Sequence, residues 1–212
     1  MNKVLLYNPK SAEAKHRVPN AILNIAASVN GRYGWTIVDG NCEADPYAKI
    51  AAYLATGEYR YIGFTVMPGP QTKQAIPFSK RIKEEFPGTV MIWGGYFPTN
   101  HYKVVLRSGY VDFVILGPGD HAFPALLDAL ENGTPYELIR NLAYKCGDEV
   151  IKTAKEELIE QDTLPPLPYD QLHQLYPISK YYLGKTYLGD KTLAYHSSIG
   201  CPFTCSFCAV VP

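Results

Sequence analysis

The chain has 212 residues, of which 47% are hydrophobic, and this is enough to bury the core of one or two domains. Twenty Lys and Arg residues balance twenty Asp and Glu residues, which argues against nucleic acid or an anionic membrane surface as an electrostatic partner. The apolar run that begins at Met1 is too short for a signal peptide, and no later stretch could span a bilayer, so we expect a cytoplasmic protein.

From Lys3 to about Asn132, short β-branched runs alternate with amphipathic stretches, a pattern typical of a parallel sheet with helices on both faces. Five runs are predicted to be buried strands, at residues 3–7, 35–39, 61–66, 89–93 and 111–116. Five helices are expected between and after them, the fourth being short, near residues 102–106. Pro77 is expected in the first turn of the third helix or at a kink. With right-handed crossovers, this order predicts a doubly wound, flavodoxin-like five-stranded parallel sheet in residues 1–135.

Glycine-bearing loops follow the third, fourth and fifth predicted strands. Doubly wound sheets bind ligands beyond the carboxyl ends of their strands, and all three loops belong to that edge. Because glycine has no Cβ, a ligand can approach the backbone of such a loop closely. Tight turns that bind nothing would carry the same glycines, so the pattern alone leaves both interpretations open.

The rest of the chain is predicted to contain a hairpin, a linker and the start of a second domain. Residues 142–145 and 149–152 flank a glycine turn and are predicted to pair as a hairpin. Residues 164–168 are too rich in proline for a helix or a central strand and indicate an extended linker. We therefore expect hairpin and linker in residues 136–190, and in residues 191–212 the beginning of a domain that this chain truncates.

Three cysteines, Cys201, Cys205 and Cys208, lie within eight positions near the C-terminus. A disulfide joins only two thiols and requires an oxidising compartment, and a structural zinc site takes four ligands, usually in two pairs. Cys42 and Cys146 stand alone and supply no second pair. Three thiolates on a 4Fe-4S cluster leave one iron open to bind a small molecule, and this interpretation is preferred to zinc or a redox thiol.

This cysteine spacing, with Phe207 directly before the last cysteine, resembles the signature of radical S-adenosylmethionine (SAM) enzymes. The resemblance implies that SAM binds the open iron and that Phe207 lies against its adenine. It also implies that an electron from a donor such as flavodoxin or ferredoxin splits SAM into methionine and a 5′-deoxyadenosyl radical, which abstracts hydrogen from a small-molecule substrate. Residues 192–199 would then form the first strand of a partial β/α barrel.

The N-terminal part resembles the cobalamin-binding domain that precedes the cluster motif in cobalamin-dependent radical SAM enzymes. The similarity lies in residues 3–9, 65–67, 94–99 and 117–120. It implies that the Thr65 hydroxyl and the glycines at 94 and 95 line a slot for the nucleotide tail of cobalamin. It also implies that the glycines after the fifth strand flank this slot. The resemblance therefore assigns cobalamin binding to Thr65, Gly94, Gly95, Gly117 and Gly119.

The chain departs from that family's pattern at several positions. Phe97 stands where related sequences often have histidine, and Pro118 stands where they often have an acidic residue. No Asp-x-His-x-x-Gly run follows the first strand, and the histidine nearest to it, His16, has Val18 in place of the glycine. A histidine ligand beneath the cobalt is therefore not expected.

Together these patterns predict the N-terminal part of a cobalamin-dependent radical SAM enzyme. The expected reaction is methylation, or radical rearrangement or cyclisation, at an unactivated carbon, and the 212-residue chain alone is expected to be inactive. Two alternatives stay open. The front domain could belong to a radical SAM enzyme that does not use cobalamin, or the chain could be a non-catalytic cobalamin or iron-sulfur module.

Overall fold

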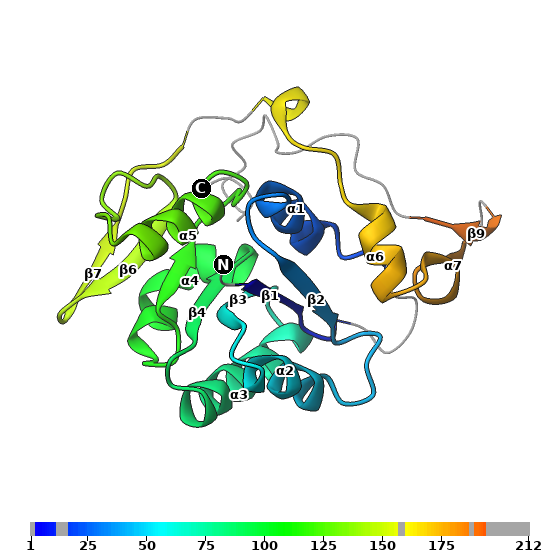
Figure 1. Cartoon of the computed structure of the whole chain (residues 1–212), viewed down its shortest axis with the longest axis horizontal. Helices are drawn as coiled ribbons and strands as arrows, with labels where there is room; N and C mark the ends of the chain where they lie inside the picture. The colour runs from blue at the N-terminus through cyan, green and yellow to red at the C-terminus, as the bar shows by residue number, and fades with distance from the viewer. Residues whose placement is uncertain (1–2, 12–16, 157–159, 187–188, 194–212) are drawn as a thin grey trace.

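A computed structural model describes residues 3–11, 17–156, 160–186 and 189–193. Its main feature is a sheet of seven described strands in the order β2-β1-β3-β4-β5-β6-β7, with helices on both faces (Figure 1). The first five strands are parallel, whereas β6 runs antiparallel to β5, and β7 runs antiparallel to β6. The strands are β1 (Lys3–Asn8), β2 (Trp35–Asp39), β3 (Tyr59–Thr65), β4 (Val90–Gly94), β5 (Phe113–Ile115), β6 (Leu142–Cys146) and β7 (Glu149–Lys152).

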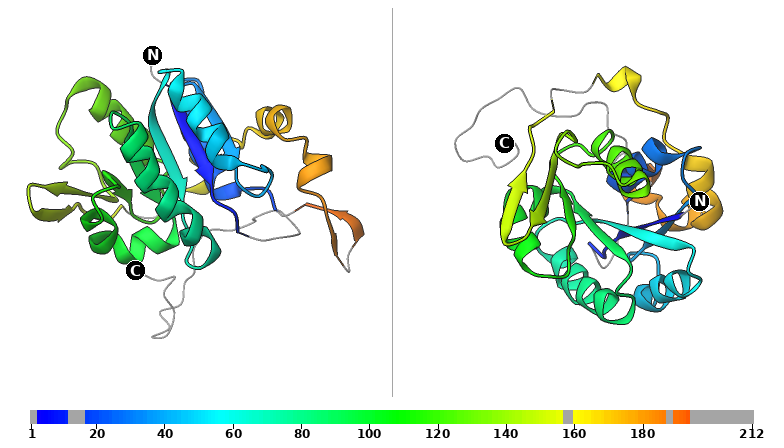
Figure 2. Two further views of the ribbon diagram at one scale, coloured as in Figure 1. Left: turned by 90° about the horizontal axis from the view of Figure 1, so that it is seen from below. Right: turned by 60° about the vertical axis from the view of Figure 1, so that its left-hand side comes forward.

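Five helices follow the five parallel strands, as the sequence predicts. On one face lie α1 (Asn20–Val29) and α5 (Ala122–Asn132), and on the other lie α2 (Pro46–Ala55), α3 (Pro70–Glu85) and α4 (Tyr96–Arg107), as Figure 2 shows from two further directions. The strand order 2-1-3-4-5 is that of the flavodoxin-like fold, so this prediction is confirmed.

The sheet is buried on both faces because its strands are apolar at successive positions. In β1, Val4 and Leu6 belong to the core beneath α1 and α5, while Leu5 and Tyr7 belong to the core beneath α2, α3 and α4. Successive side chains of a strand point to opposite faces, so a continuous apolar run is what a strand covered on both sides requires.

Local details differ from the expectation in three places. Pro70 begins α3, so Pro77 lies inside the helix and not in its first turn, and there it removes one helical N–H donor. Helix α4 begins at Tyr96 and is therefore longer than expected, with a kink at His101 (φ −124°). The hairpin of β6 and β7 forms as predicted, but it extends the main sheet and is not a separate linker element.

Residues 164–168 form neither helix nor strand, as predicted for the linker. A short 3-10 helix (Gln161–Thr163) precedes them, and α6 (Tyr169–Leu175) and α7 (Ile178–Tyr181) follow beside the β2 end of the sheet (Figure 1). Strands β8 (Gly184–Thr186) and β9 (Gly189–Thr192) form a small second sheet. The sequence did not predict these five elements, and most of the predicted strand at 192–199 lies outside the described residues. The domain boundaries at 135 and 190 stay predictions.

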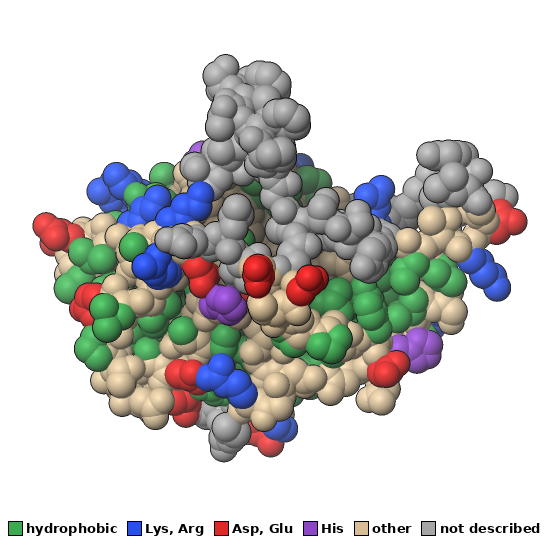
Figure 3. Space-filling model, turned by 90° about the horizontal axis from the view of Figure 1, so that it is seen from above, with side chains coloured by type: hydrophobic (Ala, Val, Ile, Leu, Met, Phe, Trp, Pro, Cys, Tyr) green, Lys and Arg blue, Asp and Glu red, His purple; other side chains and the backbone are tan. Residues whose placement is uncertain are grey.

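The molecular surface agrees with the balanced charge of the sequence. On the face seen in Figure 3, described basic and acidic side chains are interspersed around a stretch of hydrophobic surface, with no extended area of one sign. Of the helices in the described ranges, none has both the length and the apolar character needed to cross a membrane.

Candidate functional site

The carboxyl ends of β3 and β4 bring two predicted site residues side by side. Thr65 and Gly94 are register partners in the parallel pair, and both are partly exposed. The next residue of the β3 loop, Val66, donates its N–H to the carbonyl of Gly94 at 2.8 Å. The two loops therefore leave the sheet in contact with each other.

Gly95 allows this close approach. Its φ of +97° is a conformation that residues with a side chain rarely adopt. A Cβ atom at this position would lie 3.0 Å from the Val66 nitrogen and 3.3 Å from Thr65 Oγ1. Only glycine fits here without displacing backbone, and the edge above β3 and β4 consequently carries no side chain from this position.

Thr99 joins the β4 loop to the β5 loop. Its Oγ1 donates to the carbonyl of Gly95 at 2.7 Å and accepts from the N–H of Gly117 at 2.9 Å. The sequence interpretation did not assign this residue a role. The sequence did contain a signal for this role, because the hydroxyl of a threonine in the first turns of a helix often bonds to the carbonyl four residues earlier.

The two predicted glycines after β5 have different environments. Gly117 is exposed, has a φ of +66°, and has no neighbouring atom within 4 Å of the place where a Cβ would lie. Gly119 is buried, and a Cβ there would lie 2.8 Å from Ile25 Cδ1 of α1. Gly117 thus leaves space beside its backbone, although its N–H is bonded to Thr99, whereas Gly119 allows α1 to pack closely.

Asp120 and His121 follow these glycines at the same edge. Burial raises the pKa of the Asp120 carboxyl, so this group holds its proton to higher pH than an ordinary aspartate and can then donate a hydrogen bond. His121 Nδ1 lies 2.7 Å from Glu156 Oε1. Asn141 accepts the N–H of Glu156 at 2.9 Å and so holds residue 156 beside the β5 loop.

Asn20, the first residue of α1, also lies at this edge because α1 follows the carboxyl end of β1. Asn20 is only 7% exposed, and its Oδ1 atom has no hydrogen-bond partner within the described residues. A buried acceptor without a donor destabilises a protein unless a ligand or water donates to it. The sequence did not single out Asn20, since an asparagine at a helix start usually indicates only capping.

The predicted cluster ligands Cys201, Cys205 and Cys208, together with Phe207, lie outside the described residues, and their roles stay predictions. Within the described ranges no group of three or more His, Cys, Asp or Glu side chains is arranged to hold a metal ion. Cys42 and Cys146 are both free thiols.

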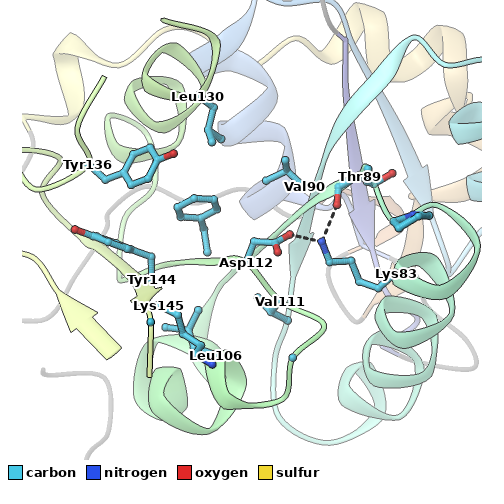
Figure 4. A pocket seen from close by; sticks show the side chains of 15 residues that line it. Lys83, Thr89, Val90, Leu106, Val111, Asp112, Leu130, Tyr136, Tyr144 and Lys145 are labelled. Atoms are coloured by element: carbon cyan, nitrogen blue, oxygen red, sulfur yellow. Dashed lines mark hydrogen bonds and ion pairs between the residues drawn. The ribbon is translucent and has the colours of Figure 1, made fainter. Parts of the chain in front are cut away.

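A pocket of about 550 Å³ opens at the opposite, amino edge of the sheet, where β4 and β5 begin (Figure 4). Lys83 Nζ donates to the Thr89 carbonyl at 2.9 Å and to Asp112 Oδ2 at 2.7 Å. The same Asp112 oxygen accepts the N–H of Met91 at 2.7 Å. Lys83, Asp112 and the backbone groups at the strand ends thus hydrogen-bond to one another. None of these groups needs a ligand as a hydrogen-bond partner.

Comparison with known proteins identifies the family of the domain. The family model described as B12 binding domain matches residues 11–127, which is more than half of the chain. A methyltransferase of Pyrococcus horikoshii, named as uncharacterized, is 27% identical over 98% of this chain and 45% of its own length. The anaerobic magnesium-protoporphyrin IX monomethyl ester cyclase of Synechocystis sp. is 27% identical over 60% of this chain and 24% of its own length. The chain thus spans less than half the length of these relatives.

Solved structures share the fold. OxsB, a cobalamin-dependent SAM radical enzyme solved with aqua-cobalamin and SAM bound, matches 85% of this chain and 25% of its own (TM-score 0.73, 17% identity). The radical SAM methyltransferase TsrM from Kitasatospora setae, solved with cobalamin and a [4Fe-4S] cluster bound, matches 74% of this chain and 32% of its own (TM-score 0.64, 16% identity). The resemblance inferred from the sequence is confirmed, and the chain belongs to the B12-binding domain family, with the fold found in cobalamin-dependent radical SAM enzymes.

Proposed function

We propose that this chain binds cobalamin at the carboxyl edge of its sheet and is the front part of a radical SAM enzyme. The observation that carries the proposal is the meeting of Thr65, Gly94 and Gly95, where no side chain from Gly95 covers the edge at which doubly wound sheets bind ligands. Cys201, Cys205 and Cys208 would hold a 4Fe-4S cluster with one iron open to SAM, as their spacing predicts.

The residues present suit the chemistry of cobalamin. The corrin ring carries several primary amides, which need acceptors for their N–H groups and donors for their carbonyls. Asn20 Oδ1 is a buried acceptor without a protein donor in the described structure. Gly117 leaves space beside its backbone, and the partly exposed Thr65 hydroxyl can donate or accept.

When bound, cobalamin would supply a methyl group or a redox step, and the cluster would supply the electron that cleaves SAM. The chain's own residues would bind and orient. Gly95 and Thr99 would hold the β4 and β5 loops in one position through the Thr99 hydrogen bonds. Asp120, whose carboxyl pKa is raised by burial, would lie beside the β5 loop.

The named relatives are a methyltransferase and a cyclase. We therefore propose methyl transfer or ring closure on a small-molecule substrate as the reaction class of the complete protein, with a flavodoxin or ferredoxin as electron donor. The chain spans less than half the length of these relatives, so the activities are proposed for the complete protein and not for this chain alone.

The test is anaerobic reconstitution of the 212-residue chain with iron, sulfide and hydroxocobalamin. We expect a cobalamin absorption spectrum that stays with the protein through gel filtration, and bound iron that is lost in Cys205→Ala while cobalamin is retained.

Iron that persists in Cys205→Ala would refute the cluster assignment. Iron without cobalt would favour a radical SAM enzyme that does not use cobalamin. Longer protein that holds both cofactors but releases no 5′-deoxyadenosine from SAM would favour a non-catalytic module.

A further inference from the structure

The linker after residue 164 is anchored to the carboxyl end of β2 by two tyrosines. Tyr182 is 1% exposed and its hydroxyl donates to Asp39 Oδ2 at 2.9 Å. Tyr176 is 2% exposed, and its hydroxyl accepts the N–H of Asp39 at 3.1 Å and donates to Glu43 Oε1 at 2.6 Å. Both tyrosines therefore contact the same residue at the end of β2.

Asp39 is fully buried, and its carboxylate is satisfied by polar groups of three segments. Oδ1 accepts from Asn8 Nδ2 at 3.0 Å and from the backbone and side-chain nitrogens of Asn41 at 3.0 and 2.8 Å. Oδ2 accepts from Tyr182. A buried carboxylate is tolerated only when such bonds replace its hydration, so each donor is held firmly in place.

The tyrosine hydroxyl acts as a permanent donor in this network. Burial, and then the charge of Asp39, raises the pKa of Tyr182 far above its ordinary value. The same two causes raise the pKa of the neighbouring Cys42 thiol to about 12. Neither group ionises near neutral pH, so Tyr182 keeps the hydroxyl proton that it donates to Asp39.

From Asp39 the hydrogen bonds continue to the loop after β3. Asn8 Oδ1 accepts from Gln71 Nε2 at 3.1 Å, and Gln71 is only 5% exposed. Gln71 Oε1 in turn accepts the N–H of Met67 at 2.8 Å. Met67 follows the Thr65–Val66 segment that contacts Gly95, so the chain of bonds runs from the linker to the predicted cobalamin slot.

We propose that Tyr182, through Asp39, Asn8 and Gln71, is a positioning residue for the cobalamin slot, so that the linker is part of the cofactor-binding unit. This inference rests on the proposed function. It goes beyond the family match, which ends at residue 127, about fifty residues before the linker tyrosines. Coupling between two sites is reciprocal, so an intact linker bond should strengthen cobalamin binding, and bound cobalamin should protect the linker to the same extent.

The alternative is that the tyrosine bonds stabilise the linker and nothing else. A matched control exists at the other edge of the sheet, where Tyr33, 7% exposed, donates to Asp128 Oδ1 at 2.8 Å. Tyr33→Phe and Tyr182→Phe each remove one hydroxyl that is bonded to a carboxylate. Only the Tyr182 hydroxyl is connected to the β3 loop by the hydrogen bonds through Asp39, Asn8 and Gln71.

Two readouts on the 212-residue chain test the proposal. Without cofactor, amide hydrogen exchange at Met67 should be about three- to tenfold faster in Tyr182→Phe than in the wild type, and within about twofold of the wild type in Tyr33→Phe. In hydroxocobalamin titrations followed by visible absorbance, the Kd should rise by a similar factor in Tyr182→Phe alone. Gln71→Met should have the same two effects. In the Tyr182→Phe/Gln71→Met double variant, the Kd should rise by less than the product of the two factors measured in the single variants.

The proposal is overturned if the wild type binds hydroxocobalamin and Tyr182→Phe matches Tyr33→Phe in both readouts. A wild type that binds no cobalamin, while Met67 exchange still responds to Tyr182→Phe, refutes the proposed function but supports the link between linker and β3 loop. The whole inference is supported if Met67 exchange becomes faster and the Kd rises in both Tyr182→Phe and Gln71→Met. In the double variant, the Kd must then rise by less than the product of the two single factors.

Discussion

The two edges of the parallel sheet differ in what their polar groups bind. At the amino edge, Lys83 pairs with Asp112, and Tyr33 donates to Asp128. At the carboxyl edge, Asn20 Oδ1 has no partner among the described residues, and Gly117 has open space where a Cβ would lie. The polar groups named at the first edge bond to one another, whereas Asn20 Oδ1 at the second edge is an acceptor that a ligand could use.

The difference separates stability from binding in a testable way. A substitution at the amino edge should change the free energy of unfolding without changing the affinity for cobalamin. A substitution at the carboxyl edge should change the affinity by more than its effect on folding explains. Thermal unfolding and hydroxocobalamin titration are the paired measurements that separate the two effects.

The largest effect is expected from Gly95→Ala. The substitution forces an alanine to a φ of +97° and places its Cβ 3.0 Å from the Val66 nitrogen, so it should cost about 2–4 kcal/mol of stability and weaken cobalamin binding at least about tenfold. Gly133→Ala is the control, because that residue also has positive φ (+64°) but no atom near its missing Cβ. The control should lose only about 1 kcal/mol and bind normally. Equal affinities in the two variants would contradict a slot at Gly95.

A smaller effect is expected from Thr99→Val, which removes the hydroxyl between the β4 and β5 loops. We expect a loss of about 1 kcal/mol in unfolding free energy and about fivefold weaker cobalamin binding, because both loops border the slot. Thr56 at the amino edge is the control, because its Oγ1 also donates to a backbone carbonyl, that of Tyr53 at 2.7 Å, and accepts a backbone N–H, that of Glu58 at 3.2 Å, but within one turn and not between two loops. Thr56→Val should match the stability loss and leave the Kd unchanged. If both variants bound alike, the Thr99 bridge would be structural only.

Asn20→Leu should move the two measurements in opposite directions. Removing a buried acceptor that lacks a donor should raise the unfolding free energy of the cofactor-free protein by about 1 kcal/mol, while the loss of a ligand contact should weaken cobalamin binding about threefold. A higher melting temperature with an unchanged Kd would show that Asn20 does not contact the cofactor. A lower melting temperature would show that Oδ1 has a protein or water donor in solution.

The smallest effect on binding is expected from Lys83→Met at the amino-edge pocket. The variant loses the partly buried bonds to Asp112 and to the Thr89 carbonyl, so it should unfold at lower temperature by an amount equivalent to about 1 kcal/mol. Its Kd for hydroxocobalamin should equal that of the wild type. Lys145→Met, which changes an exposed lysine of the same pocket, should alter neither quantity. A cobalamin defect in Lys83→Met would remove the distinction between the edges.

Much of the fold was predictable because its signals are local. The apolar run of β1 and the glycine that ends α5 each follow from short stretches of sequence, and the strand order then follows from the rules for right-handed crossovers. The length of α4 was mispredicted because Gly95, at its start, was taken only as a loop residue. Helices α6 and α7 were missed because they are short and are held by tertiary contacts of Tyr176 and Tyr182.

The sequence by itself determined the class of the domain, the edge at which cobalamin is proposed to bind and the three cysteines proposed to hold a cluster, since these depend on periodicity, glycine positions and spacing. Only the tertiary structure showed that Thr99 bridges two loops, that Asn20 presents an unsatisfied acceptor and that the linker tyrosines meet Asp39. Tyr182 and Asp39 are 143 positions apart. No local pattern encodes such a contact, because it exists only once the sheet has brought β2 beside the linker.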